Sequence, residues 1–197
     1  MNNLFDIKGN VTVITGGTGV LGRAIAKYLA LNGAKVVILG RKEDVGNQIA
    51  ADIRAEGGEC EFMKTDVLNV EVVRKNCEDI LAKYGRVDTL LNAAGGNMPG
   101  ATIPPDKTIF DLQPDQFQTV LDLNLTGTVI PTQIFLEPMV KQGKGSIIPL
   151  LSRPLGDVLI LVVLYSLISG AIKTIKTTNR SALTYAIENL SDAPQEV

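Results

Sequence analysis

Residues 11–22 read VTVITGGTGVLG, and residues 23–33 continue as RAIAKYLALNG. The apolar run at 11–14 has the length of a buried strand, and the apolar residues after the glycines recur at helical spacing until Gly33. This order predicts a strand, a tight glycine turn and a helix. The N-terminus of such a helix carries unpaired backbone N–H groups and a partial positive charge, which favour a bound phosphate. Glycines also begin ordinary helices, so the turn alone leaves a structural role open.

Gly16, Gly19 and Gly22 give this turn the spacing TGxxGxxG. Because glycine has no side chain, the chain can turn tightly here and a pyrophosphate can approach the backbone closely. The position of the turn directly after the first strand favours nucleotide binding.

Strands and helices alternate along the rest of the first 151 residues. Such alternation predicts an α/β fold with a doubly wound parallel sheet that helices cover on both faces. In the last helix, Asp115 is the expected N-cap, and Pro131 and Pro138 are expected to kink its later part. The strands after the first are expected at 35–39, 59–63, 87–91 and 146–151, and the helices after the first at 43–56, 70–84 and 115–141.

The composition excludes several kinds of chemistry. The chain has 197 residues, no His, 19 Lys plus Arg and 21 Asp plus Glu, with a formal net charge of -2. Without His there is no imidazole general base, no Ser-His or Cys-His nucleophile pair and no His-ligated zinc. The near-neutral charge argues against a nucleic-acid partner. Cys60 and Cys77 are expected to be buried, reduced thiols, and no metal site is predicted.

Residues 1–197 are expected to form a single domain with no membrane partner. The N-terminus, MNNLFDIKGN, lacks a basic region followed by an apolar run, which indicates a cytoplasmic location. The apolar run at 158–168, VLILVVLYSLI, is eleven residues long and falls short of the roughly 20 that span a bilayer. A buried helix or strand is therefore expected there.

The second expected strand ends in LGRK, with Arg41 where a dinucleotide-binding fold contacts the adenosine ribose. An acidic residue there would bond a 2′-hydroxyl, whereas arginine favours a 2′-phosphate, so Arg41 predicts NADP. Two alternatives stay open. Arg41 and Lys42 could be a solvated pair, and Asp44 keeps NAD possible.

Four motifs carry a resemblance to a known family: TGGTGVLG at 15–22, TDV at 65–67, LNAAGG at 91–96 and DLNLTGT at 122–128. In order and separation they resemble the short-chain dehydrogenase/reductase family. The resemblance covers residues 4–148 and implies a Rossmann-type fold of three layers, an NAD or NADP cofactor and a homodimer or homotetramer. The AGGNMPGAT loop is similar to the sugar-acid branch, of mannonate and fructuronate type.

The resemblance also assigns roles to residues. Asp66 and Val67 would lie against the adenine, and Asn124 would order a catalytic water and lysine. Residues 92–95 would stabilise the central strand and border the cofactor, with Asn92 mainly structural. The structural alternatives are a turn residue for Asp66 and a polar interruption of a helix for Asn124. The expected cofactor-binding residues are Gly16, Thr18, Gly19, Leu21, Gly22, Arg41, Asp66, Val67, Asn92, Ala93 and Gly95.

The catalytic part matches the family less well. The family's reaction uses a tyrosine that exchanges the proton, a serine that bonds the substrate oxygen and a lysine that lowers the tyrosine pKa. Ser152 and Tyr165 stand at the family's separation, but Ser169 occupies the place of the lysine. A tyrosine pKa is ordinarily near 10, and a nearby cation is what favours the phenolate at neutral pH. Lys173, about 12 Å further along a helix, is too distant. The structural alternatives are an interior aromatic residue for Tyr165 and a serine at the end of a strand for Ser152.

Three functions are therefore compared. The leading one is an NAD(P)-dependent oxidoreductase that transfers a hydride between the nicotinamide and a small alcohol or carbonyl substrate, such as a sugar acid. The second is a dinucleotide-binding relative that is catalytically impaired or truncated, because residues 149–197 depart from the family pattern and the last strands are expected to be missing. Divergence, truncation and a changed reading frame after Ile148 all fit this departure. The third is an interaction protein.

Overall fold

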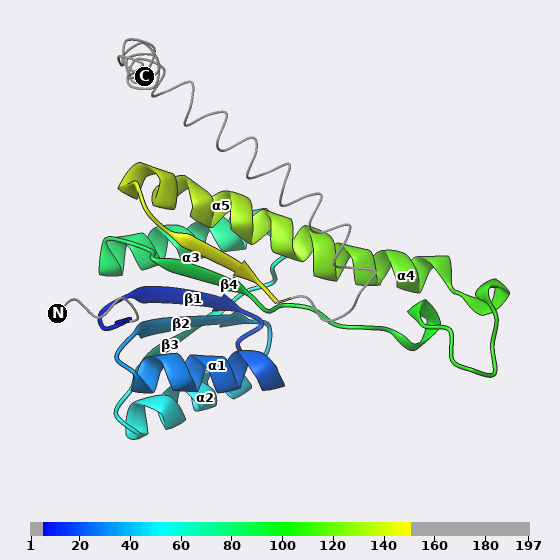
Figure 1. The fold of residues 1–197 in the computed structure, drawn as a ribbon, viewed down its shortest axis with the longest axis horizontal. Coiled ribbons are helices and arrows are strands. Elements are labelled where there is room, and N and C mark those ends of the chain that lie inside the picture. The colour runs from blue at the N-terminus through cyan, green and yellow to red at the C-terminus, as the bar shows by residue number, and fades with distance from the viewer. Residues whose placement is uncertain (1–5, 151–197) are drawn as a thin grey trace, which may run out of the picture. The chain divides into compact units, whose positions relative to one another are not determined.

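The computed structural model describes residues 6–150, which fold around a parallel sheet of five strands in the order β3-β2-β1-β4-β5 (Figure 1). The strands are β1 (Val11–Thr15), β2 (Lys35–Gly40), β3 (Glu59–Lys64), β4 (Thr89–Asn92) and β5 (Ser146–Pro149). The α-helices are α1 (Val20–Leu31), α2 (Glu43–Ala55), α3 (Val70–Tyr84), α4 (Pro114–Leu121) and α5 (Gly127–Gln142). A π-helical turn, η3 (Asp122–Thr126), joins α4 to α5, and the 3-10 turns η1 (Pro99–Ala101) and η2 (Ile109–Asp111) lie in the preceding loop.

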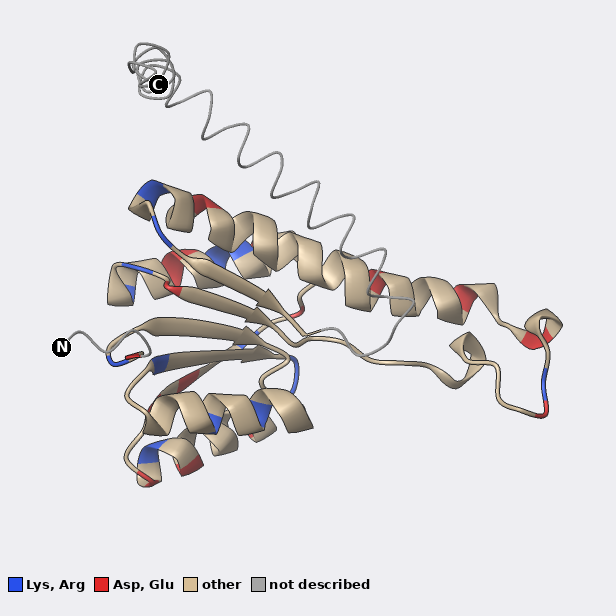
Figure 2. Cartoon of the chain, viewed as in Figure 1, with Lys and Arg blue, Asp and Glu red and all other residues tan. Residues whose placement is uncertain are grey.

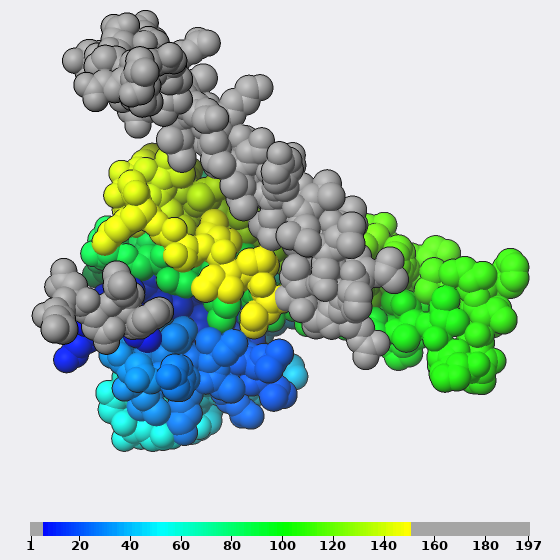
Figure 3. All heavy atoms as spheres, viewed as in Figure 1, coloured from blue at the N-terminus to red at the C-terminus, as the bar shows by residue number. Residues whose placement is uncertain are grey.

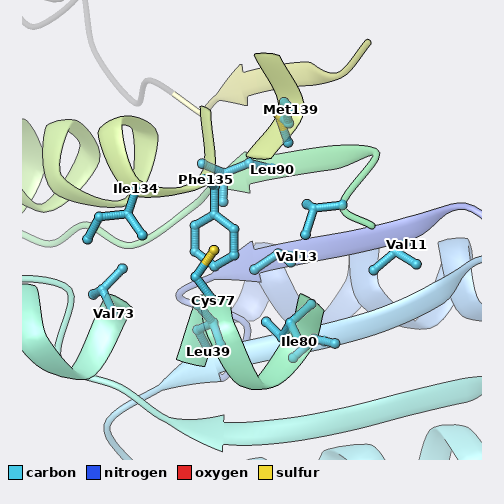
Figure 4. Close-up of a cluster of buried hydrophobic side chains, with 12 residues drawn as sticks. Val11, Val13, Leu39, Val73, Cys77, Ile80, Leu90, Ile134, Phe135 and Met139 are labelled. Carbon is cyan, nitrogen blue, oxygen red and sulfur yellow. The ribbon is translucent and has the colours of Figure 1, made fainter. Parts of the chain in front are cut away.

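The two faces of the sheet bury alternate side chains under different helices. Val13 packs in a cluster with residues of α3 and α5, whereas its neighbour Ile14 packs with residues of α1 and α2. Figure 4 shows the first cluster, in which Phe135 of α5 points toward Cys77 of α3. Charged residues lie on helices, on loops and on the strands β2 and β3, whereas β1, β4 and β5 carry none (Figure 2). The predicted α/β fold with a doubly wound parallel sheet is confirmed.

Three strands end side by side at the carboxyl edge of this sheet. Thr15, the last residue of β1, pairs with Leu39 of β2 and with Asn92 of β4. The chain leaves β1 toward α1 on one face and leaves β4 toward α4 and α5 on the other (Figure 1). This divergence is a topological switch point, the place where open α/β sheets bind ligands.

Two strand boundaries differ from the predicted ones. β4 begins at Thr89 rather than at residue 87, because the backbone of Val87 pairs with the side-chain amide of Gln142 through bonds of 2.9 and 2.8 Å. β5 ends at Pro149 rather than at residue 151. The N–H of Leu150 still donates a 2.8 Å hydrogen bond to the carbonyl of Asn92, and residue 151 lies outside the described residues.

The long helix also differs from the prediction at its start and in its middle. Gln113, not Asp115, is the N-cap, because Pro114 takes the first helical position, where a missing N–H costs nothing. The two prolines do not interrupt the helix, since α5 runs continuously through Pro131 and Pro138. The irregularity lies earlier, in the π-helical turn η3.

Both cysteines are buried and free, as predicted. Within residues 6–150, no helix is long and apolar enough to cross a membrane, and no three His, Cys, Asp or Glu side chains gather as a metal site. The cytoplasmic location stays a prediction. The expectations for the 158–168 run and for the missing last strands concern residues outside the described ones.

Candidate nucleotide-binding site

A cleft of about 290 Å³ opens at the carboxyl edge of the sheet, where β1, β2, β3 and β4 end. Its walls come from the glycine turn after β1, the end of β2, the segment after β3, the segment after β4 and one residue of η3. The lining residues are Gly16, Thr18, Gly19, Leu39, Gly40, Arg41, Lys42, Thr65, Asp66, Val67, Ala93, Ala94, Gly95 and Leu123.

The glycine turn is packed so tightly that a Cβ at Gly16 or at Gly22 would overlap backbone atoms. Gly16 has a φ of +66°, and a Cβ there would lie 2.5 Å from the carbonyl oxygen of Ala93. A Cβ at Gly22 would lie 2.4 Å from the carbonyl oxygen of Gly16. The turn is thereby pressed against β4 on one side and against its own helix on the other.

The helix that follows the turn starts without a protein group that caps it. Gly19 is the N-cap of α1 and supplies no side-chain acceptor, and the first turn of α1 holds no acidic residue. Its first N–H groups are therefore available to an anion, whose charge the helix dipole also favours.

The neighbouring Gly17, by contrast, has a packing role. A Cβ at Gly17 would lie 2.5 Å from Cβ of Ile38, a fully buried residue of β2. At the end of the same strand, a Cβ at Gly40 would lie 2.9 Å from Cγ2 of Thr18. These two contacts seat the turn on β2.

The end of β2 supplies positive charge to the cleft. Arg41 and Lys42 both line it and are exposed, and neither forms an ion pair with a residue of 6–150. The nearest acidic residue along the chain, Glu43, pairs instead with Lys64 at 3.1 Å. Both cations therefore remain available to a negatively charged ligand.

The segment after β3 is a turn that Asp66 itself holds. The Asp66 carboxylate accepts a hydrogen bond of 3.0 Å from the N–H of Leu68, and its carbonyl accepts one of 3.0 Å from the N–H of Asn69. Behind it, the buried hydroxyl of Thr65 accepts a bond of 2.7 Å from the side chain of Asn76 on α3. Asp66 thus fits the turn role and also lines the cleft with Val67.

The segment after β4 is fixed by hydrogen bonds to its neighbours. Thr15 Oγ1 accepts bonds of 3.1 Å from the N–H groups of both Ala93 and Ala94. Asn92 is only 2% exposed and donates a bond of 3.0 Å from Nδ2 to the hydroxyl of Thr132 on α5. Asn92 therefore joins β4 to α5 and does not line the cleft.

Asn124 holds the loop after β4 with its side-chain amide. Nδ2 donates bonds of 2.7 Å to the carbonyl of Gly96 and 2.8 Å to the carbonyl of Val120, and Oδ1 accepts a bond of 3.2 Å from the N–H of Gly96. A Cβ at Gly95 would lie 2.6 Å from this Oδ1. Both Nδ2 hydrogens are used within the protein, so the amide acts as a clamp on the loop.

The structure brings most of the predicted residues together. Leu21, Gly22 and Asn92 do not line the cleft, and Asn124 stands behind its wall. Ser152, Tyr165 and Ser169 lie outside the described residues. The predicted residues that line the cleft are Gly16, Thr18, Gly19, Arg41, Asp66, Val67, Ala93 and Gly95.

Several lining residues were not predicted. Gly40, Lys42 and Thr65 stand beside predicted residues within the same motifs, so the motifs could have indicated them. Leu123 stands beside Asn124 within the motif at 122–128, but its place in the wall of the cleft depends on the π-helical turn. The unpredicted residues that line the cleft are Leu39, Gly40, Lys42, Thr65 and Leu123, whereas Ala94 falls within the predicted range 92–95.

A second hollow, of about 470 Å³, lies between α1 and α2. Three of its charged groups have partners, since Lys27 and Glu56 form an ion pair of 2.6 Å and Asp52 accepts a hydrogen bond of 2.7 Å from Gln48. It contains none of the motif residues and lies away from the switch point.

Residues 10–179 match the model of the short chain dehydrogenases. This chain belongs to the short-chain dehydrogenase family. Among curated relatives, this chain is 35% identical over 175 residues to an uncharacterized oxidoreductase, UxuB, of Bacillus subtilis. The match covers 85% of this chain and 63% of that relative. It is also 30% identical over 186 residues to the 7alpha-hydroxysteroid dehydrogenase of Clostridium sardiniense. That match covers 93% of this chain and 68% of that enzyme. The chain thus spans about two thirds or less of these relatives.

Solved structures of short-chain dehydrogenases share the fold. A protein named as a D-mannonate oxidoreductase from Haemophilus influenzae, with bound NAD, superposes with a TM-score of 0.66 at 32% identity over 73% of this chain and 55% of that one. A metagenomic short-chain oxidoreductase in complex with NADP gives 0.67 at 28% identity over 76% of this chain and 65% of that one.

The residues of this short-chain dehydrogenase fit a nicotinamide dinucleotide. The glycine turn packs without side chains against Ala93 and against α1, the helix start lacks a competing carboxylate, and the two exposed cations at the end of β2 form no ion pair with a residue of 6–150. These are the features that a pyrophosphate and an adenosine ribose need.

Proposed function

We propose that this chain is an NAD(P)-dependent oxidoreductase that holds its cofactor in the cleft at the carboxyl edge of the sheet. One observation carries the proposal, the contact of the glycine turn with the end of β4, where a Cβ at Gly16 would lie 2.5 Å from the Ala93 carbonyl oxygen. That contact leaves the uncapped start of α1 open to a pyrophosphate at the switch point.

NADP is the proposed cofactor. Arg41 follows Gly40, so no carboxylate stands at the end of β2 to bond a ribose 2′-hydroxyl, and Lys42 adds a second cation. A guanidinium binds phosphate through paired, charge-assisted hydrogen bonds. NAD is the alternative, since the D-mannonate oxidoreductase relative has NAD bound.

A bound nicotinamide would supply the carbon that accepts or donates the hydride. In this proposal Tyr165 exchanges the proton with the substrate oxygen, and Ser152 donates a hydrogen bond to that oxygen. Asn124 acts as a positioning residue, because its amide fixes the Gly96 backbone beside the cleft.

The proposed substrate is a small alcohol or carbonyl compound of the sugar-acid class. The support is the likeness to the D-mannonate oxidoreductase, together with the sequence AGGNMPGAT in the loop that follows β4. In this chain that loop, at 93–113, extends away from the sheet (Figures 1 and 3).

The test combines binding with turnover. Calorimetric titration of the full chain with NADPH and NADH should show saturable binding that is tighter for NADPH. Nicotinamide absorbance should then report turnover on a panel of sugar acids, polyols and simple ketones. A protein that binds cofactor and turns over no member of the panel would contradict the oxidoreductase and support the second candidate.

The second candidate is a dinucleotide-binding protein without turnover. The observation that favours it is Ser169, at the position where the family has its lysine. A Ser169→Lys variant separates the two. An oxidoreductase with a poorly activated tyrosine should gain turnover, whereas a non-catalytic protein should bind cofactor as before and gain none.

A homodimer or homotetramer is the proposed assembly. Its support is the resemblance to the family, in which the long helix that contains Asn124 commonly forms the interface. Light scattering at micromolar concentration should give a mass of two or four chains, and a monomer would contradict the proposal.

A further inference from the structure

Gly127 opens helix α5 at a point where the helix touches the wall of the nucleotide cleft. A Cβ at this buried glycine would lie 2.8 Å from Cγ2 of Val67 and 3.7 Å from Cδ2 of Leu68. Val67 lines the cleft and is only 6% exposed. The absence of a side chain at Gly127 is therefore what lets α5 rest on the segment that follows β3.

The contact cannot be relieved by an easy side-chain movement. Valine is branched at Cβ and has few χ1 rotamers, so Cγ2 of the buried Val67 cannot swing far. Carbon atoms in contact are ordinarily 3.5–4.0 Å apart, so a methyl group at Gly127 would require α5 and Val67 to separate by about 0.7 Å or more.

The helix that would move also carries the opposite wall of the cleft. Leu123, four residues before Gly127, lines the cleft from the π-helical turn. Asn124, beside it, clamps the backbone of Gly96 through two hydrogen bonds. A shift of α5 away from Val67 therefore carries Leu123 and the Gly95–Gly96 wall with it.

We infer that Gly127 is a positioning residue for the dinucleotide: by seating α5 directly on Val67, it sets the width of the cleft between the segment after β3 and the segment after β4. This inference rests on the proposed function, because it concerns the same cofactor. The contact joins two segments that border the cleft and lead into helices on the same face of the sheet, α3 and α5, so one methyl group at this point should alter binding without touching the ligand.

The experiment is a double-variant cycle on the full chain, read as NADPH affinity by calorimetry. Gly127→Ala should weaken binding about tenfold, as expected for a single overpacked methyl group. Val67→Ala removes Cγ2, so the Val67→Ala, Gly127→Ala double variant should bind within about twofold of Val67→Ala alone. Val67→Ile enlarges the same contact from the other side and should also weaken binding, which keeps the test open if Gly127→Ala does not fold.

The matched control is Gly145→Ala. Its Cβ would lie 2.6 Å from the side chain of Met139, at the opposite end of the sheet, before β5 begins. This variant should lower the melting temperature and leave NADPH affinity unchanged, as any merely structural glycine would.

The outcomes distinguish this inference from the proposed function. If the folded wild-type chain binds neither NADPH nor NADH, the proposed function fails. If the wild type binds and Gly127→Ala binds equally well, or if the double variant shows no rescue, Gly127 does not set the cleft and only this inference is overturned.

Discussion

The side chain of Asn124 and the backbone of Gly96 form a two-way hydrogen-bonded pair, in which Nδ2 donates to the carbonyl at 2.7 Å and Oδ1 accepts from the N–H at 3.2 Å. The two residues are 28 positions apart, on η3 and on the loop after β4. The pair fixes a glycine segment, which has no side chain of its own to hold it, beside the cleft. π-helical turns within α-helices are frequent at functional sites, and this one places the amide that makes the bond.

Asn124→Ala should free the loop after β4. The variant loses three hydrogen bonds, but water can reach Gly96, so the free energy of unfolding should fall by only about 1 kcal/mol. Amide hydrogen exchange at residues 95–97 should become faster, because the loop loses its anchor. The control is Gln118→Ala, which removes the 2.8 Å hydrogen bond from Gln118 of α4 to Asp122 of η3. This variant should leave the exchange at residues 95–97 unchanged. Equal exchange in both variants would refute the clamp.

Gly16→Ala should abolish cofactor binding and lower the free energy of unfolding by about 3 kcal/mol, because it adds backbone overlap to an unfavourable φ. Gly9→Ala is the matched control. Gly9 has a φ of +75°, against +66° for Gly16, but a Cβ there meets nothing within 4 Å. The control should therefore cost only about 1 kcal/mol and bind cofactor normally. Urea denaturation and calorimetry measure both effects, and similar losses in the two variants would show that overlap with Ala93 is unimportant.

Arg41→Ala should reduce affinity for NADPH by about tenfold or more and leave affinity for NADH nearly unchanged, because only NADPH carries the 2′-phosphate. Lys27→Ala, whose ammonium pairs with Glu56 away from the cleft, controls for the loss of one positive charge. Parallel titrations with NADPH and NADH give the ratio of the two affinities for each variant. An equal loss for both would mean that Arg41 does not discriminate between them.

The buried thiols should make stability fall in alkaline solution. Burial raises the pKa of Cys60 from 9.0 to about 12 and that of Cys77 from 9.0 to about 11. The folded state then holds protons that the unfolded state releases, so the stabilising contribution is complete below pH 9 and is lost as pH rises toward those values. Urea denaturation below pH 9 and at about pH 10 should show this loss, and a Cys60→Ala variant should show less of it.

The same environment should keep both thiols unreactive, since the thiolate is the reactive form. A thiol reagent at neutral pH should modify the folded chain slowly and the urea-unfolded chain quickly. Fast labelling of the folded chain would contradict the burial of Cys60 and Cys77.

The alternation of strands and the cofactor glycines could be predicted from the sequence because both depend on local patterns. The apolar run at 11–14 and the glycines after it determine a strand and a turn without reference to distant residues. Asp66 follows β3 and Ala93 follows β4, and both residues line the cleft at the carboxyl edge of the sheet, because the carboxyl ends of parallel strands meet at one edge.

Features that depend on contacts between distant segments could not be predicted. Gly17 is required by Ile38 of the next strand, and Gly127 by Val67, and neither partner is visible in the local sequence. The π-helical turn that brings Leu123 to the cleft lies before Pro131, and the helix continues through that proline, because local proline rules ignore how a helix packs on the sheet.

The most direct test of the cleft is a calorimetric titration of the full wild-type chain with NADPH, repeated with Gly16→Ala and Gly9→Ala. Saturable binding by the wild type and by Gly9→Ala, with none by a folded Gly16→Ala, is the predicted result. Absence of saturable binding of both NADPH and NADH to the folded wild-type chain would contradict the assignment of this cleft as a dinucleotide site.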